Sequence, residues 1–275
     1  MMLHTDLILC GLLSIIIGVI SAVLGLGGGF LLIPMYTLLF GLDPVLAIGT
    51  SLTTTIFTAG SASVCHAREK NIQYPVVFLL ILGSLPTIIV AIYLTQFIPG
   101  FILSALFSLL LVYIAISMVI DRGSITCSTS EEIPPTFSPV EGYNWRNVLK
   151  HPILFIWGIA GGLVSGLSGV SAGTIYVPAL LRSGFPIKYA VAASLASIVI
   201  ISSGAALMSL LLGQIAFSFL IFSAGGVSIG AIIGVRLSNC VRSSTIRYMF
   251  SLAMIGIAVV MLNNEFSQLM SEYFD

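Results

Sequence analysis

The sequence predicts an all-α integral membrane protein with about 8–10 transmembrane segments in two homologous halves, arranged as an inverted repeat. Of the 275 residues, 58% are hydrophobic and only 7% are charged, whereas soluble domains carry about 25% charged residues. Long apolar runs recur along the chain, and the second half repeats the pattern of the first half. A chain with so little polar surface cannot cover a water-soluble globule, so we expect a lipid bilayer around it.

The apolar runs predict the helices and divide the chain. They lie near 7–24, 28–40, 45–65, 76–97 and 101–120, and again near 153–167, 174–183, 187–212, 217–238 and 244–262. Most suit a spanning helix of about 20 residues, but the second run of each half is short. The pattern leaves open whether 7–40 and 153–183 span fully or form re-entrant hairpins. The expected parts are a first membrane repeat (7–120), a cytoplasmic linker (121–151), a second membrane repeat (152–262) and a short acidic tail (263–275).

The two halves keep a common register. A shift of 144 positions pairs Gly25 with Gly169 and Gly29 with Gly173, and after a one-residue slip a shift of 143 pairs Ser51 with Ser194. Chance resemblance between apolar helices would not hold such a register, so we interpret the halves as the product of gene duplication.

The ten Lys and Arg residues indicate how the halves sit in the membrane. If the halves are inverted, the 66–75 loop, the linker, the 182–188 turn and the 236–247 turn face one side, which then carries every cation. If the halves were parallel, the cations would divide equally between the two sides. The positive-inside rule therefore favours an inverted repeat with both termini outside.

Glycine-rich segments interrupt the apolar runs at matching places, LGLGGGFLLIP at 24–34 and LSGVSAGTIYVP at 167–178. Glycine costs up to about 1 kcal/mol in a helix interior, so both segments predict a helix break. In transporters built from inverted repeats, substrate sits near the midplane where broken helices meet. Free amides at a helix start attract anions, so we expect an anion site here. Close packing of membrane helices through small residues is the competing interpretation.

Proline favours the first turn of a helix. We therefore expect the helix of the third run to begin at Asp43-Pro44 in the first half and at Pro186 in the second half. Hydroxyl side chains then recur at helical spacing in the first copy: Ser51, Thr54 or Thr55, Thr58 and Ser61. Thr54 falls about 15 Å into this helix, near the midplane. Ser194 and Ser197 line the matching face of the second copy. These hydroxyls either contact substrate or only satisfy backbone carbonyls.

Some residue types are scarce in ways that limit the function. No Asp or Glu lies clearly inside an apolar run, so we expect an uncoupled or weakly coupled path. An inside-negative potential would expel an anion with about 2.3 kcal/mol per charge per 100 mV, which points to export. The net charge is zero, which argues against nucleic-acid binding. We expect no metal and no cofactor, and an oligomer is compatible with the sequence.

An enzyme is the main rival among function classes. The segment GLSG at 166–169 matches the GxSG pattern of intramembrane serine proteases, but these need a general base on a later helix. No histidine follows His151. We therefore predict no catalytic residues and no enzyme activity, while a non-transport membrane scaffold stays an alternative.

Several motifs, in this order, resemble the sulfite exporter (TauE/SafE-like) family of membrane anion permeases. They are GxGGGFxxxP at 25–34, GLDPVLAIGTSL at 41–52, HAREKNI at 66–72, GQI at 213–215, and the paired segments FSLLLVYIAISM and FSLAMIGIAVVM. The resemblance implies a multi-pass exporter of sulfite or organosulfonates in the bacterial inner membrane. Thiosulfate, another small oxyanion or another small metabolite is the alternative cargo.

The resemblance also implies pore contacts at Gly27, Gly28, Gly29, Thr50 and Ser51 in the first half. The second half would add Ser171, Gly173 and Ser194. Together with Thr54 and Ser197 from the hydroxyl pattern, these complete the candidate substrate-binding residues.

Overall fold

The computed structural model of the protein describes residues 4–120 and 152–238, together with 256 and 259. All regular elements in these ranges are helical, as the composition predicts. The expected linker, the acidic tail and nearly all of the last apolar run lie outside the described residues.

The helices follow the apolar runs closely. In the first half they are α1 (His4–Leu24), α2 (Gly29–Pro34), the π-helix η1 (Met35–Leu39), α3 (Pro44–Arg68), α4 (Tyr74–Thr95) and α5 (Gly100–Ile120). In the second half they are α7 (Pro152–Ser168), α8 (Gly173–Arg182), α9 (Ile187–Leu211) and α10 (Phe217–Ser238). The helix breaks predicted at the glycine-rich segments are confirmed.

The start of α3 is as predicted, with Pro44 in its first turn and the Asp43 carboxylate accepting a hydrogen bond of 2.9 Å from the Val45 amide. Such a cap satisfies a backbone donor that the helix leaves free. In the second copy Pro186 is the residue before α9 rather than its first residue.

Within the described residues, five helices are long and apolar enough to cross a membrane: Thr5–Leu24, Pro44–Arg68, Tyr74–Thr95, Ile187–Leu211 and Phe217–Leu237. The segments Gly29–Leu39, Gly100–Val112 and Ile153–Ser168 are shorter apolar helices. The second span, α3, is the most buried of the five, with 67% of its apolar window inside the protein. It therefore forms the centre of the bundle.

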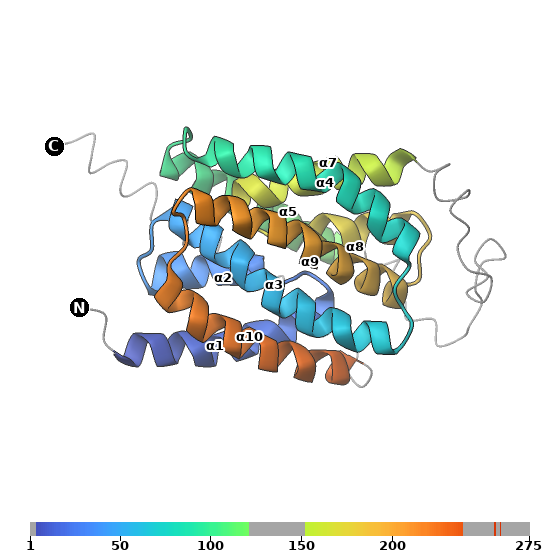
Figure 1. The fold of residues 1–275 in the computed structure, drawn as a ribbon, viewed down its shortest axis with the longest axis horizontal. Helices are drawn as coiled ribbons and strands as arrows, with labels where there is room; N and C mark the ends of the chain where they lie inside the picture. The colour runs from blue at the N-terminus through green and yellow to red at the C-terminus, as the bar shows by residue number, and fades with distance from the viewer. Residues whose placement is uncertain (1–3, 121–151, 239–255, 257–258, 260–275) are drawn as a thin grey trace.

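Glycines let α1 and α10 pack closely side by side. Gly11 of α1 lies against Phe222, and further along both helices Gly18 lies against Val227. Because residue numbers rise together along the contact, the two helices run in the same direction (Figure 1).

The helices α7 and α4 form a second close pair of the same kind. Gly158 of α7 lies against Leu80, and Gly166 lies against Ile88, so this pair is also parallel. Each pair joins the first helix of one half to the fourth helix of the other half, which makes the packing of the two halves reciprocal.

The third helices, α3 and α9, run in opposite directions beside each other (Figure 1). Lys188 in the first turn of α9 pairs with Glu69, directly after the end of α3. At the opposite end, the Ala216 amide, just before α10, donates to the Thr50 hydroxyl near the start of α3. Corresponding helices of the two halves are therefore antiparallel here.

The first two helical segments of each half form a hairpin whose turn lies inside the bundle. The turn residue Gly28 lies beside Thr58, at the middle of α3. The chain then returns through η1, and Phe40 contacts Phe219 near the start of α10 with ring centroids 5.1 Å apart. Residues 4–40 thus enter from one end and leave at the same end. Residues 152–182 do so from the other end (Figure 1).

Every Lys and Arg of the described residues lies at one end of the bundle, where α3 and α10 end and α9 begins. These residues are Arg68, Lys70, Arg182, Lys188 and Arg236. The sequence predicts such a grouping if the two halves are inverted, because the loops and turns that carry Lys and Arg then face the same side of the membrane.

Candidate substrate site at the glycine turns

The two glycine-rich breaks meet in the middle of the bundle. A Cβ atom on Gly29 would lie 2.6 Å from the Gly169 carbonyl oxygen, and a Cβ atom on Gly173 would lie 2.6 Å from the Gly25 carbonyl oxygen. Both distances are too short for a side chain, so the close crossing of the two breaks requires glycine. The two contacts are equivalent, because the repeat register pairs Gly25 with Gly169 and Gly29 with Gly173.

The third helices hold both breaks through matching serines. Ser51 Oγ lies 3.4 Å from the Gly169 carbonyl oxygen and 3.4 Å from that of Gly29. Ser194 Oγ donates to the Gly25 carbonyl over 3.2 Å. The structure therefore brings the predicted site residues Gly29, Ser51, Gly173 and Ser194 together with the carbonyls of Gly25 and Gly169.

The turn of the first break has a conformation that favours glycine. Gly27 has φ of 77° and Gly28 has φ of 100°, in the left-handed region where a side chain is strained. A Cβ atom on Gly27 would also overlap the Ser171 hydroxyl. We call residues 27–29 the glycine turn.

Three buried hydroxyls border the glycine turn and have no hydrogen-bond partner. They belong to Ser21, Thr58 and Ser171, whose side chains are completely buried. A Cβ atom on Gly28 would lie 3.1 Å from Ser21 Oγ and 3.7 Å from Thr58 Oγ1, while Gly27 lies against Ser171. Buried polar groups are almost always hydrogen-bonded, so three unpaired hydroxyls at one turn indicate a site for a polar ligand.

The backbone of the glycine turn adds further donors. Among the hydrogen bonds of the described residues, none engages the amides of Gly27, Gly28 or Gly29, although all three residues are buried. Successive free amides form a concave donor surface that suits an anion. The turn therefore combines backbone and hydroxyl donors from α1, α3 and the second break.

Thr54, also predicted as a site residue, lies in a separate cluster of hydroxyls. Its Oγ1 is 3.2 Å from the Tyr36 hydroxyl and 3.2 Å from Ser223 Oγ, and Tyr36 donates to Ser223 over 2.8 Å. This cluster joins η1 and α3 to α10 of the other half. In the second half, Tyr176 of α8 similarly contacts Ser84 of α4.

Two more predicted residues have hydroxyls that already bond to backbone groups. Thr50 donates to the Leu46 carbonyl over 2.7 Å and accepts from the Ala216 amide over 2.9 Å. Ser197 donates to the Ala193 carbonyl over 2.8 Å. For Thr50, Thr54 and Ser197, contact with a substrate stays a prediction.

Two residues of the site, Ser21 and Thr58, are not among the site residues that the sequence predicts. Thr58 belongs to the hydroxyl pattern of α3, but nothing in that pattern distinguishes it from Thr54. Ser21 stands one turn before the glycines, and its signal was the matching Ser165 in the second half. Only the packing of α1 and α3 around the turn shows that both hydroxyls lack a partner.

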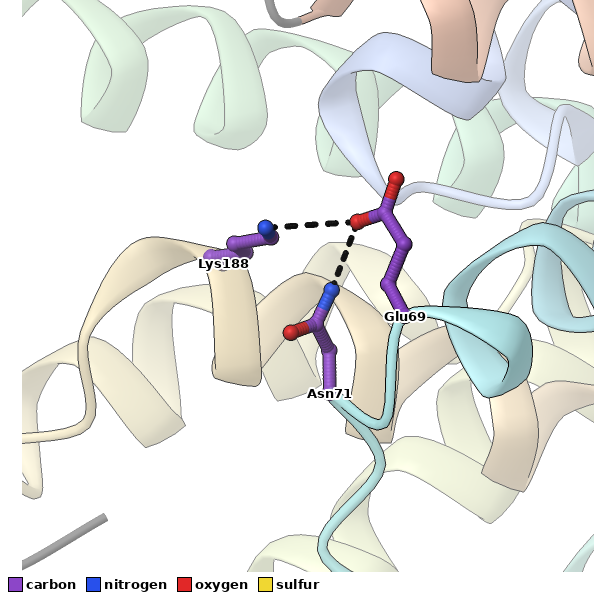
Figure 2. Close-up of polar contacts among 3 residues, drawn as sticks. All are labelled: Glu69, Asn71 and Lys188. Carbon is purple, nitrogen blue, oxygen red and sulfur yellow. Dashed lines mark hydrogen bonds and ion pairs between the residues drawn. The ribbon is translucent and has the colours of Figure 1, made fainter. Parts of the chain in front are cut away.

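At the end of the bundle that carries the cations, a polar cluster joins the two halves (Figure 2). Lys188 Nζ lies 3.2 Å from Glu69 Oε2, and Asn71 Nδ2 donates to the same oxygen over 2.8 Å. The hydrogen bond from Lys188 is the main reason why the pKa of Glu69 is lowered. Both charged side chains are partly exposed, 53% for Lys188 and 38% for Glu69, so the pair is open to solvent.

Comparison with known proteins agrees with a membrane carrier. The chain is 26% identical over 258 residues to a protein described as the probable membrane transporter protein YunE of Bacillus subtilis, covering 89% of this chain and 93% of that protein. It is 28% identical over 231 residues to the probable membrane transporter protein YdhB of the same organism, covering 83% and 89%. The probable membrane transporter protein MJ0441 of Methanocaldococcus jannaschii is 27% identical over 199 residues, covering 70% and 68%. No solved structure matches the chain.

The family comparison covers both halves. Residues 10–261 match the family described as sulfite exporter TauE/SafE, so the match includes both glycine-rich breaks and both third helices. The chain belongs to the sulfite exporter TauE/SafE family of membrane transporters.

Proposed function

We propose that the protein is a permease that exports small sulfur-containing anions, sulfite or organosulfonates, across the bacterial inner membrane. The anion binds at the glycine turn, close to the middle of α3. The observation that carries this proposal is the set of three buried, unpaired hydroxyls, Ser21, Thr58 and Ser171, beside the glycine-turn amides, for which the described residues show no hydrogen bond. Hydroxyl and amide donors are the groups that an oxyanion needs when it leaves water.

In an inverted repeat, both halves contribute to a site at the glycine turn. Two observations support such a repeat. The helices α3 and α9 run antiparallel, and the two breaks make reciprocal contacts, Gly29 with Gly169 and Gly173 with Gly25. In such an arrangement one half can move against the other around a fixed site, which opens the site to each side in turn.

The direction of transport follows from electrostatics. The proposed mechanism uses no coupling ion. Carriers that couple transport to protons or cations usually place a carboxylate within the membrane, whereas α3 and α9 carry hydroxyls and no carboxylate along their lengths. The membrane potential alone then drives anions outward, with about 2.3 kcal/mol per charge per 100 mV.

Flux into proteoliposomes with an imposed potential tests the proposal. Sulfite, an organosulfonate, thiosulfate and sulfate are compared for the wild-type protein and for the variants Ser171→Ala and Thr58→Val. Both variants remove a hydroxyl that has no partner in the protein, so we expect at least a tenfold loss of flux, about 1.4 kcal/mol per lost contact, with unchanged thermal stability.

Ser203→Ala is the matched control, because the Ser203 hydroxyl is exposed and donates only to the Val199 carbonyl of its own helix. Flux that survives both site variants would move the site away from the glycine turn. Flux of thiosulfate alone would replace the proposed cargo, and no flux of any anion would favour a non-transport scaffold.

A further inference from the structure

The glycine turn contains no charged group among its nearest neighbours. The atoms closest to Gly27, Gly28 and Gly29 belong to Ser21, Thr55, Thr58, Ser171, Ser51 and the Gly169 carbonyl. None of these side chains ionises near neutral pH. The site therefore stabilises a ligand through neutral hydrogen-bonding groups alone.

The ionisable side chains on the surrounding elements lie elsewhere. Arg68 follows Thr58 by ten positions along α3, about 15 Å away, and Lys188 is paired with Glu69 at the end of the bundle. The Tyr36 and Tyr176 hydroxyls are bonded to Ser223 and Ser84. The remaining ionisable groups of α1, α3, α8, α9 and α10 lie near helix ends: His4, Asp6 and Cys10 in the first half of α1, Asp43 just before α3, Cys65 and His66 near the end of α3, Arg182 at the end of α8, Tyr189 in the first turn of α9, and Arg236 near the end of α10.

The cost of moving an ion out of water rises with the square of its charge. The cost is about four times larger for two charges than for one, so a few neutral hydroxyls and amides with no opposite charge nearby can offset it far more readily for a monoanion than for a dianion. The three hydroxyls of the site also act as acceptors. A ligand that carries its own O–H group can therefore donate to the site as well as accept from it.

We propose that the glycine turn binds oxyanions with a single negative charge and rejects dianions, so that sulfite is carried as hydrogen sulfite. This inference rests on the proposed function and adds the charge state of the cargo. One elementary charge then moves with each anion, and the ion crosses unchanged.

The test is the pH dependence of flux in proteoliposomes. Three probes are compared: sulfite, methanesulfonate, which keeps one negative charge, and sulfate, which carries two. The pH range spans the second ionisation of sulfite, and empty liposomes at each pH correct for leakage. We expect the apparent KM for total sulfite to rise about tenfold per pH unit above that ionisation, with one common curve against hydrogen sulfite concentration.

Methanesulfonate flux should stay constant over the same range, which separates ligand ionisation from ionisation of the protein, His66 included. Sulfate flux should equal that of empty liposomes. The inference is wrong if the rate of sulfite flux follows the concentration of the sulfite dianion or of total sulfite instead of hydrogen sulfite. It is also wrong if methanesulfonate is carried and sulfite is not. Sulfate flux as fast as that of methanesulfonate would contradict it as well. Absence of flux for all three anions would overturn the proposed function itself, and this inference with it.

Discussion

Ser51 Oγ lies 3.4 Å from the carbonyl oxygen of Gly169, although 118 residues separate them in the chain. The matching pair, Ser194 and Gly25, makes the same contact in the opposite sense. Each third helix thus holds the glycine break of the other half. The two breaks are parts of one structure, and a change at either one is expected to affect both.

A methyl group at Gly29 should destabilise the protein, because its Cβ atom would lie 2.6 Å from the Gly169 carbonyl oxygen and 2.8 Å from the Ser171 amide nitrogen. Overpacking of this kind costs about 1–3 kcal/mol, so Gly29→Ala should lower the melting temperature in detergent. Gly60→Ala is the control, because nothing lies within 4 Å of its Cβ position in α3. Equal stability of the two variants would show that the breaks do not cross closely.

Removal of the Tyr36 hydroxyl should weaken the contact between the hairpin of the first half and α10. Tyr36→Phe leaves the ring in place but takes away the donor to Ser223. We expect a loss of about 0.5–1.5 kcal/mol in the free energy of unfolding, measured by chemical denaturation in detergent. Tyr93→Phe serves as control, because the Tyr93 side chain is 47% exposed. A loss no greater than that of the control would contradict the hydroxyl cluster.

The Glu69–Lys188 pair should make a small contribution to stability that depends on pH. The pKa of Glu69 is lowered, chiefly by the hydrogen bond from Lys188, so the folded protein favours the ionised carboxylate. The contribution is therefore complete above the ordinary pKa of glutamate, about 4.3, and is lost as pH falls through the lower pKa of the folded state. Exposed pairs contribute at most about 1 kcal/mol.

A comparison of melting temperatures for wild type and Glu69→Gln checks this relation. The difference should be present at neutral pH and low salt, shrink with added salt, and disappear in acid. A difference that persists unchanged in acid would show that it does not arise from the ionised carboxylate.

The direction of the helices predicts which ends share a side of the membrane. Single cysteines are introduced at Lys70 and Ser183, next to the ends of α3 and α8, and at Ser218, in the first turn of α10, after replacement of the native cysteines. An impermeant thiol reagent should label the first two positions from the same side and the third from the opposite side. Labelling of positions 70 and 218 from one side would contradict the inverted repeat.

The local features of the fold could be predicted from the sequence. Apolar runs gave the described helices to within a few residues, and the glycine-rich segments gave the breaks, because hydrophobicity and glycine content act within single segments. The choice between full spans and hairpins could not be made in this way. It depends on where Gly28 lies relative to the middle of α3, which is a contact between segments.

The candidate site was only partly predictable for the same reason. Thr50, Thr54 and Thr58 lie on one helix and are chemically equivalent, yet the Thr50 hydroxyl bonds to the Ala216 amide, Thr54 joins the tyrosine cluster, and Thr58 has no partner. Whether a hydroxyl is satisfied depends on the rotation and packing of neighbouring helices.

The sequence by itself thus determined that the chain spans a membrane, where its helices break and which residue types surround the breaks, since these follow from composition and local pattern. Only the tertiary structure decided that Ser21 of α1 and Ser171 of the second break meet at the glycine turn. Residues so far apart in the chain come together through helix packing, because close approach of α1 and α10 and of the two breaks fixes where each hydroxyl lies.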